Sequence, residues 1–211
     1  MRSLPLLGLP ALLGWATMTA CGGMEPDFLE PEALQDATVT LIPGHCAGVI
    51  VEDGLHLLTA AHCVDPMAQR IEVALRDGTR MGAQALRVDP GQDLALYQLD
   101  SAAPVTPLPL SPEMPTPGER LLFAGRNDRP GGIQAVWLEK LGRCPSLPDV
   151  PQALFTTLRG EKGDSGAPVV DSRMHVVGLV HGGAACSIAA PTARFAPVVR
   201  QFAENDIVAS Q

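Results

Sequence analysis

Three short motifs carry side chains that could together perform acyl transfer. His62 lies in the sequence LTAAHC, Asp93 in QDLAL and Ser165 in GDSGAP. A serine hydroxyl is a weak nucleophile at neutral pH, so Ser165 needs a base within hydrogen-bond reach, and a neutral imidazole can serve as one. A carboxylate on the other ring nitrogen fixes the tautomer and stabilises the imidazolium that forms. Each motif alone could be a packed histidine, a turn or a loop, but their joint occurrence predicts a nucleophile, a base and an orienting acid.

Two alternative assignments use neighbouring residues. Asp89 is a weaker candidate for the orienting carboxylate. The pairs His45-Cys46 and His62-Cys63 could instead form a Cys2His2 metal site, but they lack the short Cys-x-x-Cys unit usual in such sites. An exported chain should also oxidise its thiols. The sequence therefore predicts neither a metal ion nor another cofactor.

The segments around these motifs have the pattern of short β-strands. Alternating, β-branched runs are separated by Gly, Asp and Pro, which predicts an all-β fold with one C-terminal helix. A proline-rich connector at 101–118 separates two sets of strands and is a candidate domain boundary. The first set is expected at 37–42, 48–52, 55–60, 71–76, 83–88 and 94–99, and the second at 121–124, 134–139, 153–158, 167–170 and 175–180.

The three motifs, in the order histidine, aspartate, serine, resemble those of the trypsin and chymotrypsin family of serine proteases. The resemblance covers residues 37–211. It implies two antiparallel six-stranded β-barrels, at about 37–105 and 119–195, followed by a helix at about 195–203. The active site would lie in the cleft between the barrels. By this likeness the protein is a serine endopeptidase that cleaves proteins or peptides through an acyl-enzyme.

The resemblance also assigns an oxyanion hole to the backbone N–H groups of Gly163 and Ser165. Two departures from the family occur in this context. No Ile-Val-Gly-Gly segment follows an Arg or Lys, so Asp164 has no newly cut N-terminus to pair with, and we expect activity without proteolytic maturation. Ala167 replaces the usual glycine and should change packing, not chemistry.

Residues on either side of the GDSGAP motif determine the expected substrate pocket. Arg159 stands six residues before Ser165, where trypsin-like members carry the Asp that selects basic side chains, so a basic P1 residue is not expected. The segment that begins at His181 replaces the family's Ser-Trp-Gly wall. Arg159, Lys162 and His181 could select an acidic P1 residue, or the first two could face solvent beside a pocket for small apolar side chains. The expected lining residues are Arg159, Lys162, His181, Gly183 and Thr192.

Four of the five cysteines are expected in two disulfides. In the family a disulfide clamps the histidine loop, and Cys46 and Cys63 stand where it would close. Cys144 and Cys186 form the second expected pair. Both bonds require an oxidising compartment.

The N-terminal segment predicts export. A short basic start, an apolar stretch and the lack of acidic residues before Glu25 indicate a signal peptide at 1–20. The stretch MTACGG resembles a bacterial lipobox, in which Cys21 becomes the acylated N-terminus. Residues 21–36 are acidic and should form an extended tether in solvent. We expect a protein of the bacterial cell envelope, held at a membrane by lipid, with plain secretion as the alternative.

Composition narrows the class of protein. The 211 residues are 46% hydrophobic and 18% charged, with a formal net charge of -8, which indicates a soluble globular chain. The 15 Lys and Arg are scattered, which argues against nucleic-acid binding because phosphate recognition needs clustered basic residues. We expect a monomer. A protease-like binding module that has lost turnover and an esterase are the alternative functions.

Overall fold

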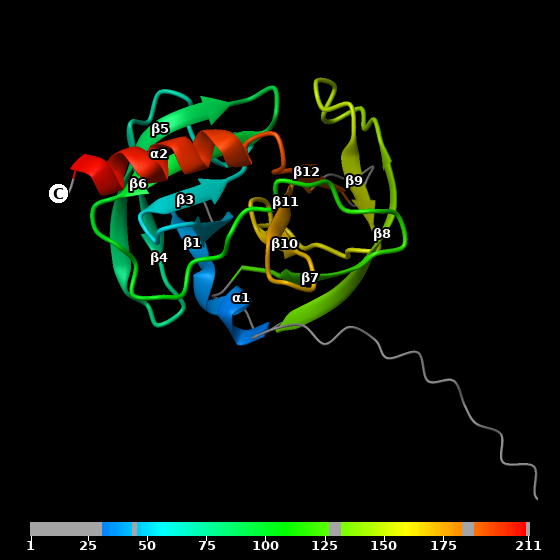
Figure 1. Cartoon of the computed structure of the whole chain (residues 1–211), viewed down its shortest axis with the longest axis horizontal. Coiled ribbons are helices and arrows are strands. Elements are labelled where there is room, and N and C mark those ends of the chain that lie inside the picture. The colour runs from blue at the N-terminus through cyan, green and yellow to red at the C-terminus, as the bar shows by residue number, and fades with distance from the viewer. Residues whose placement is uncertain (1–30, 44–45, 127–131, 183–187, 210–211) are drawn as a thin grey trace, which may run out of the picture.

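The computed structural model describes residues 31–43, 46–126, 132–182 and 188–209. Two closed antiparallel barrels of six strands each make up most of it (Figure 1). The first barrel has the spatial order β1-β2-β3-β6-β5-β4. Its strands are β1 (Thr38–Ile42), β2 (Ala47–Val51), β3 (His56–Thr59), β4 (Arg70–Ala74), β5 (Arg80–Asp89) and β6 (Leu94–Leu99).

The second barrel has the spatial order β10-β11-β12-β9-β8-β7. Its strands are β7 (Arg120–Ala124), β8 (Ile133–Gly142), β9 (Ala153–Thr156), β10 (Pro168–Val170), β11 (Val176–Val180) and β12 (Ile188–Pro191). The predicted fold class, two antiparallel six-stranded barrels with a C-terminal helix, is confirmed. Closure of each barrel leaves no unpaired sheet edge, so every strand's backbone groups find partners within the fold.

One strand of the second barrel, β12, is not predicted by the sequence pattern. β12 reads IAAP and pairs with β11 through Leu179↔Ala190 and with β9 through Ile188↔Phe155. Alanine and proline are poor strand formers, and four residues are too few to display an alternation. Its pairing comes from the neighbouring strands and not from its own residues.

The end of the acidic N-terminal segment is helical, which corrects the expectation of an extended tether up to residue 36. Helix α1 spans Pro31–Ala37, and Leu34 and Ala37 on one of its faces are fully buried. The carbonyl of Leu34 accepts a hydrogen bond of 2.6 Å from the hydroxyl of Thr38. The acidic charges of this segment favour solvent, but Leu34 and Ala37, three positions apart, are buried together against both barrels.

The proline-rich connector contacts both barrels. The backbone N–H of Leu108 donates to Ile50 in β2 at 3.0 Å, and the N–H of Ser111 donates to Val176 in β11 at 2.9 Å. Helix α2 (Ala196–Ala209) then returns from the second barrel and lies over the first (Figure 1). The guanidinium of Arg200 on this helix donates to the carbonyl of Leu110. These two crossings fix the orientation of the barrels.

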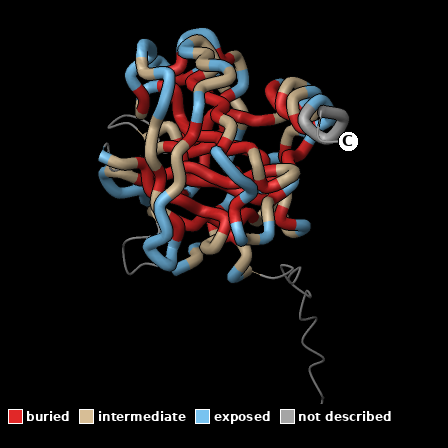
Figure 2. The backbone as a smooth tube through the Cα atoms, turned by 90° about the vertical axis from the view of Figure 1, so that its left-hand side faces the viewer, coloured by how far each residue is buried: buried red, intermediate tan, exposed pale blue. Residues whose placement is uncertain are grey.

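A continuous apolar core joins the two halves. Buried residues, red in Figure 2, run through the interior of the molecule. One cluster of buried side chains contains Leu58 and Leu94 of the first barrel, Val176 and Leu179 of the second, and Leu108 of the connector. Because close-packed interiors resist deformation, this shared core holds groups from different barrels at fixed positions.

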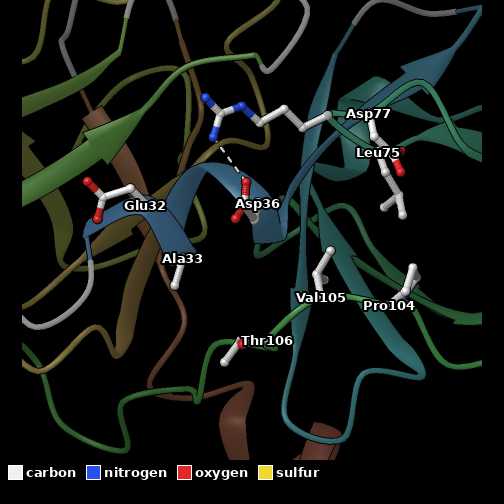
Figure 3. Close-up of a pocket in the computed structure, with 9 residues that line it drawn as sticks. Glu32, Ala33, Asp36, Leu75, Asp77, Pro104, Val105 and Thr106 are labelled. Carbon is white, nitrogen blue, oxygen red and sulfur yellow. Dashed lines mark hydrogen bonds and ion pairs between the residues drawn. The ribbon is translucent and has the colours of Figure 1, made fainter.

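A pocket of about 530 Å³ opens beside α1 (Figure 3). Its lining includes Glu32, Asp77 and Val105, and Asp36 at its edge pairs with Arg76 at 3.0 Å. None of the residues with a predicted catalytic role lines it. Within the described ranges no helix combines the length and the apolarity that crossing a membrane requires.

Candidate active site

His62 lies in the short 3₁₀ helix η1 (Ala61–Cys63) that follows β3. The predicted disulfide between Cys46 and Cys63 is present and ties this helix to the start of β2. The hydroxyl of Thr59, at the end of β3, donates to the carbonyl of Ala47 at 2.7 Å. The histidine loop is therefore anchored on both sides. The disulfide also removes both thiols as metal ligands, and His45 lies outside the described residues.

Asp93 lies in the turn that leads into β6. Its backbone has a φ of 52°, and its N–H donates to the carbonyl of Pro90 at 3.2 Å. The neighbouring candidate, Asp89, accepts a bond of 3.1 Å from the N–H of Gln92 and so stabilises the same turn. This turn aims the Asp93 carboxylate inward, where its side chain is only 5% exposed.

The Asp93 carboxylate contacts both the ring and the backbone of His62. Nδ1 of His62 lies 3.0 Å from each carboxylate oxygen, and the backbone N–H of His62 donates to Oδ1 at 3.0 Å. An ionised carboxylate only accepts hydrogen bonds, so Nδ1 carries the proton and Nε2 presents its lone pair. The two groups have the geometry of an oriented general base.

A second imidazole lies on the same carboxylate. Nδ1 of His181 contacts Oδ2 of Asp93, and the His181 and His62 rings meet edge to face with centroids 5.1 Å apart. The sequence assigned His181 to the substrate pocket, but its side chain is engaged with Asp93. The sequence did not predict this contact, because His181 and Asp93 are 88 residues apart and belong to different barrels.

These contacts set the ionisation of Asp93. Burial by itself raises the pKa of a carboxyl group, but the hydrogen bonds from His181 and His62, the charge on His62 and its backbone N–H together outweigh it. The pKa of Asp93 is consequently lowered from 3.8 to about 2. The carboxylate therefore remains ionised throughout the pH range in which a histidine base can work.

Ser165 lies in the loop before β10, at the junction of the barrels. Its backbone carbonyl accepts a bond of 2.8 Å from the N–H of Ala47 in β2 and lies 3.7 Å from Sγ of Cys63, next to His62. Its hydroxyl donates to the carbonyl of His181 at 3.2 Å and not to His62. The structure thus brings Ser165 beside the histidine loop with the hydroxyl turned toward His181.

Two backbone N–H groups of the GDSGAP motif make no hydrogen bond to other described residues. Within the part of the chain that the structure describes, neither the N–H of Gly163 nor that of Ser165 donates a hydrogen bond. The neighbouring N–H of Gly166, by contrast, donates to the carbonyl of Val180 at 2.7 Å. Gly163 has a φ of 99°, a conformation that glycine adopts without strain. The assignment of these two N–H groups to an oxyanion hole remains a prediction.

Comparison with known proteins identifies the family of the chain. Residues 46–179 match the family described as the trypsin-like peptidase domain. The chain belongs to this family. No curated protein sequence matches it.

Solved structures of proteases share the fold of this trypsin-like peptidase. The Rv3671c protease in its inactive form has a TM-score of 0.65 at 18% identity, over 81% of this chain and 90% of the other. A serine endoprotease from Yersinia pestis has a TM-score of 0.64 at 21% identity, over 82% and 66%. The HtrA-type protease AlgW with a decapeptide has a TM-score of 0.61 at 25% identity, over 74% and 50%. The chain therefore spans less than two thirds of the length of the latter two.

Asp164 of this trypsin-like peptidase is occupied by local backbone groups. The residue is buried, and its carboxylate accepts bonds from the N–H of Glu161 at 2.6 Å and the N–H of Arg126 at 3.3 Å. The loop that carries Ser165 is thus braced from within. The expectation that activity needs no newly cut N-terminus remains a prediction.

The other residues assigned to the substrate pocket lie in varied surroundings. Arg159 and Lys162 are exposed. Thr192 is fully buried, and its hydroxyl donates to the carbonyl of Val176 at 2.8 Å, so it secures the segment before α2 and does not line a pocket. Gly183 lies outside the described residues.

Two further predictions involve cysteines that lie outside the described residues. Cys144 is buried, but Cys186, its expected partner, lies outside them. Cys21, the expected lipid-bearing residue, also lies outside them. Both assignments remain predictions.

Gly166 should be the glycine of the GDSGAP motif least tolerant of a side chain. Its φ is +84°, and a Cβ there would overlap the carbonyl of Ala47 and lie 3.0 Å from the N–H of Ala60. We expect Gly166→Ala to destabilise the protein by about 3 kcal/mol or more, measured by urea denaturation.

Gly78→Ala is the matched control for this substitution. Gly78 has nearly the same φ, +87°, but nothing lies within 4 Å of its added Cβ. We expect it to cost about 1 kcal/mol from backbone strain alone. Equal losses at the two positions would show that the overlap at Gly166 is relieved without cost.

Proposed function

We propose that this trypsin-like peptidase is a serine endopeptidase in which Ser165 is the nucleophile, His62 the general base and Asp93 the residue that orients His62. The observation that carries the proposal is the contact of Nδ1 of His62 with both oxygens of the buried Asp93 carboxylate, at 3.0 Å each. This contact keeps the lone pair of Nε2 available on the opposite side of the ring.

In the proposed reaction the Ser165 hydroxyl rotates from the carbonyl of His181 toward Nε2 of His62. His62 takes the proton as Oγ attacks the scissile carbonyl, and the resulting imidazolium is stabilised by Asp93. His62 then gives the proton to the leaving amine, which leaves an acyl group on Ser165. Water, activated by His62, releases the acyl group and restores the enzyme.

The N–H groups of Gly163 and Ser165 are the proposed oxyanion hole. In the tetrahedral intermediate the former carbonyl oxygen carries a negative charge, which two fixed donors stabilise without reorganisation. Such a donor is worth roughly 3 to 4 kcal/mol in the transition state. The lack of intramolecular acceptors for these two N–H groups among the described residues supports this role.

Cleavage of a peptide library by the wild type and by Ser165→Ala tests the proposal. A wild type that cleaves and a variant that does not would support an endopeptidase. Folded wild-type protein that neither cleaves peptides nor reacts with a fluorophosphonate would favour the binding module without turnover. Hydrolysis of esters with no cleavage of any peptide would favour the esterase.

The same library resolves the P1 preference. Exposed Arg159 and Lys162 lie close to Ser165 in sequence, and they support an acidic P1 residue if a bound substrate draws them to the pocket. Small apolar P1 residues would dominate if both side chains remain in solvent. The His181 side chain contacts Asp93, so we assign it to neither the acidic nor the apolar form of the P1 pocket.

We infer that the protein is exported. The disulfide between Cys46 and Cys63 supports an oxidising compartment. The signal-like segment at 1–20 and the lipobox-like stretch around Cys21 further support a lipid-anchored protein of the bacterial envelope, with the outer membrane as the proposed site.

Cys21→Ser should therefore move the protein from the membrane fraction to the soluble fraction, because a stable anchor needs two or more acyl chains. Fractionation of cells that express each form measures the change. Unchanged membrane association would exclude Cys21 as the anchor.

A further inference from the structure

We propose that His62, Asp93 and His181 form a binding site for a divalent transition-metal ion such as Zn²⁺, and that the bound ion inhibits the peptidase. The inhibition rests on the proposed function, whereas the binding does not. By the family resemblance a serine stands at the start of the segment where this chain has His181, so the second imidazole is a departure from the family pattern.

Three donor groups converge from three separate segments: η1, the turn before β6 and the segment after β11. One ligand atom from each residue lies within 4.8 Å of the other two. Tetrahedral zinc, with bonds of about 2.0 to 2.2 Å to nitrogen and oxygen, separates its ligand atoms by about 3.4 Å. Small side-chain rotations would bring all three donors into this range.

The chemistry of the three donors suits such an ion. Two imidazoles and one carboxylate bind Zn²⁺, Ni²⁺ and Cu²⁺ well, and three protein ligands leave one position for water. The carboxylate is held by a further bond of 3.0 Å from the backbone N–H of His62, as outer-shell bonds hold metal ligands. The His62 side chain is 42% exposed, against 5% for Asp93 and 13% for His181, so an ion can enter from the His62 side.

Metal binding would reverse the tautomer of His62. Without the ion, Nδ1–H donates to Asp93, and the lone pair of Nε2 accepts the proton of Ser165. With the ion, the Nδ1 lone pairs of His62 and His181 form the metal bonds, and the single proton of each ring moves to its Nε2. No proton is gained or lost, but Nε2–H cannot accept another proton. Attack by Ser165 therefore stops.

The position of the ion predicts the kinetic form of inhibition. The three donors meet on the Asp93 side of the His62 ring, whereas substrate is expected on the Ser165 side. The ion would then disable the base without occupying the substrate cleft, so kcat should fall while KM stays the same. A metal held by Nε2 in the cleft would instead compete with substrate.

Isothermal titration calorimetry of Ser165→Ala with Zn²⁺ measures binding in the absence of turnover. We expect one ion per chain in Ser165→Ala. In the double variant Ser165→Ala/His181→Asn the affinity for Zn²⁺ should fall by more than about 100-fold, because the loss of a residue that only supports a metal ligand already lowers affinity by up to that factor. His175→Asn in the Ser165→Ala background is the control, since His175 also faces a carboxylate, Asp171 at 3.6 Å, but has no second imidazole there. Its affinity should be unchanged.

Co²⁺ absorption of the wild type provides a readout that needs no variant. A tetrahedral spectrum that Zn²⁺ displaces would support the site, and an octahedral spectrum would overturn it. Equal Zn²⁺ affinity with and without His181, or inhibition that changes only KM, would also overturn it. Stoichiometric binding that depends on His181 in a protein without peptidase activity would uphold the site and refute the proposed function.

Discussion

Replacing Ser165 by alanine should lower kcat for peptide cleavage on the order of 10⁶-fold, the scale on which loss of a serine nucleophile acts. The substitution removes one oxygen atom and leaves His62, Asp93 and the two backbone donors in place. It should change the free energy of unfolding by less than about 1 kcal/mol, because the hydroxyl makes one bond, to the carbonyl of His181. Activity should therefore vanish from a protein that remains folded.

Ser111→Ala is the matched control for this result. The hydroxyl of Ser111 also donates to a backbone carbonyl, that of Glu113 at 2.9 Å, but it lies in the connector between the barrels. Peptide cleavage and fluorophosphonate labelling should be normal in Ser111→Ala and absent in Ser165→Ala. Cleavage that persists in Ser165→Ala would exclude this residue as the nucleophile.

The parts of the fold that were predictable are those in which local pattern and tertiary burial agree. In β2 and β3, short β-branched or apolar runs end at Gly and Asp, and they form strands where expected. β12 and α1 were not predictable because their conformations depend on partners. Ile188–Pro191 becomes a strand between β9 and β11, and Leu34 becomes buried once both barrels are present.

In the candidate site, too, some residues could be predicted from the sequence and one contact could not. His62, Asp93 and Ser165 stand in short motifs, so their residue types and order were sufficient to single them out. The contact of His181 with Asp93 depends on how the loop after β11 meets the first barrel. The residues along one strand do not determine how two barrels pack together, so this contact could not be predicted from the sequence. The sequence predicted a place for His181 in the substrate pocket instead.

Replacing Asp93 by asparagine should lower kcat by about 10⁴-fold, the scale seen when the orienting carboxylate of such a set becomes an amide. The carboxylate accepts from the backbone N–H of His62 and from Nδ1 of both histidines. An asparagine has one acceptor oxygen, so its NH₂ group must face one of the rings. If it faces His62, Nδ1 becomes an acceptor, the proton moves to Nε2 and the base is lost. Asp89→Asn, which alters the neighbouring carboxylate in the same turn, should leave kcat nearly unchanged.

The same substitution should change how stability depends on pH. The pKa of Asp93 is lowered from 3.8 to about 2 in the folded protein. A lowered pKa contributes stability that is fully present above the unfolded value and is lost as the pH falls through the folded value. The wild type should therefore lose about 2 kcal/mol of unfolding free energy between about pH 4 and pH 2 that Asp93→Asn does not lose. Urea denaturation of both proteins with a chelator present measures the difference, and parallel pH curves would mean that the histidines do not hold this carboxylate ionised.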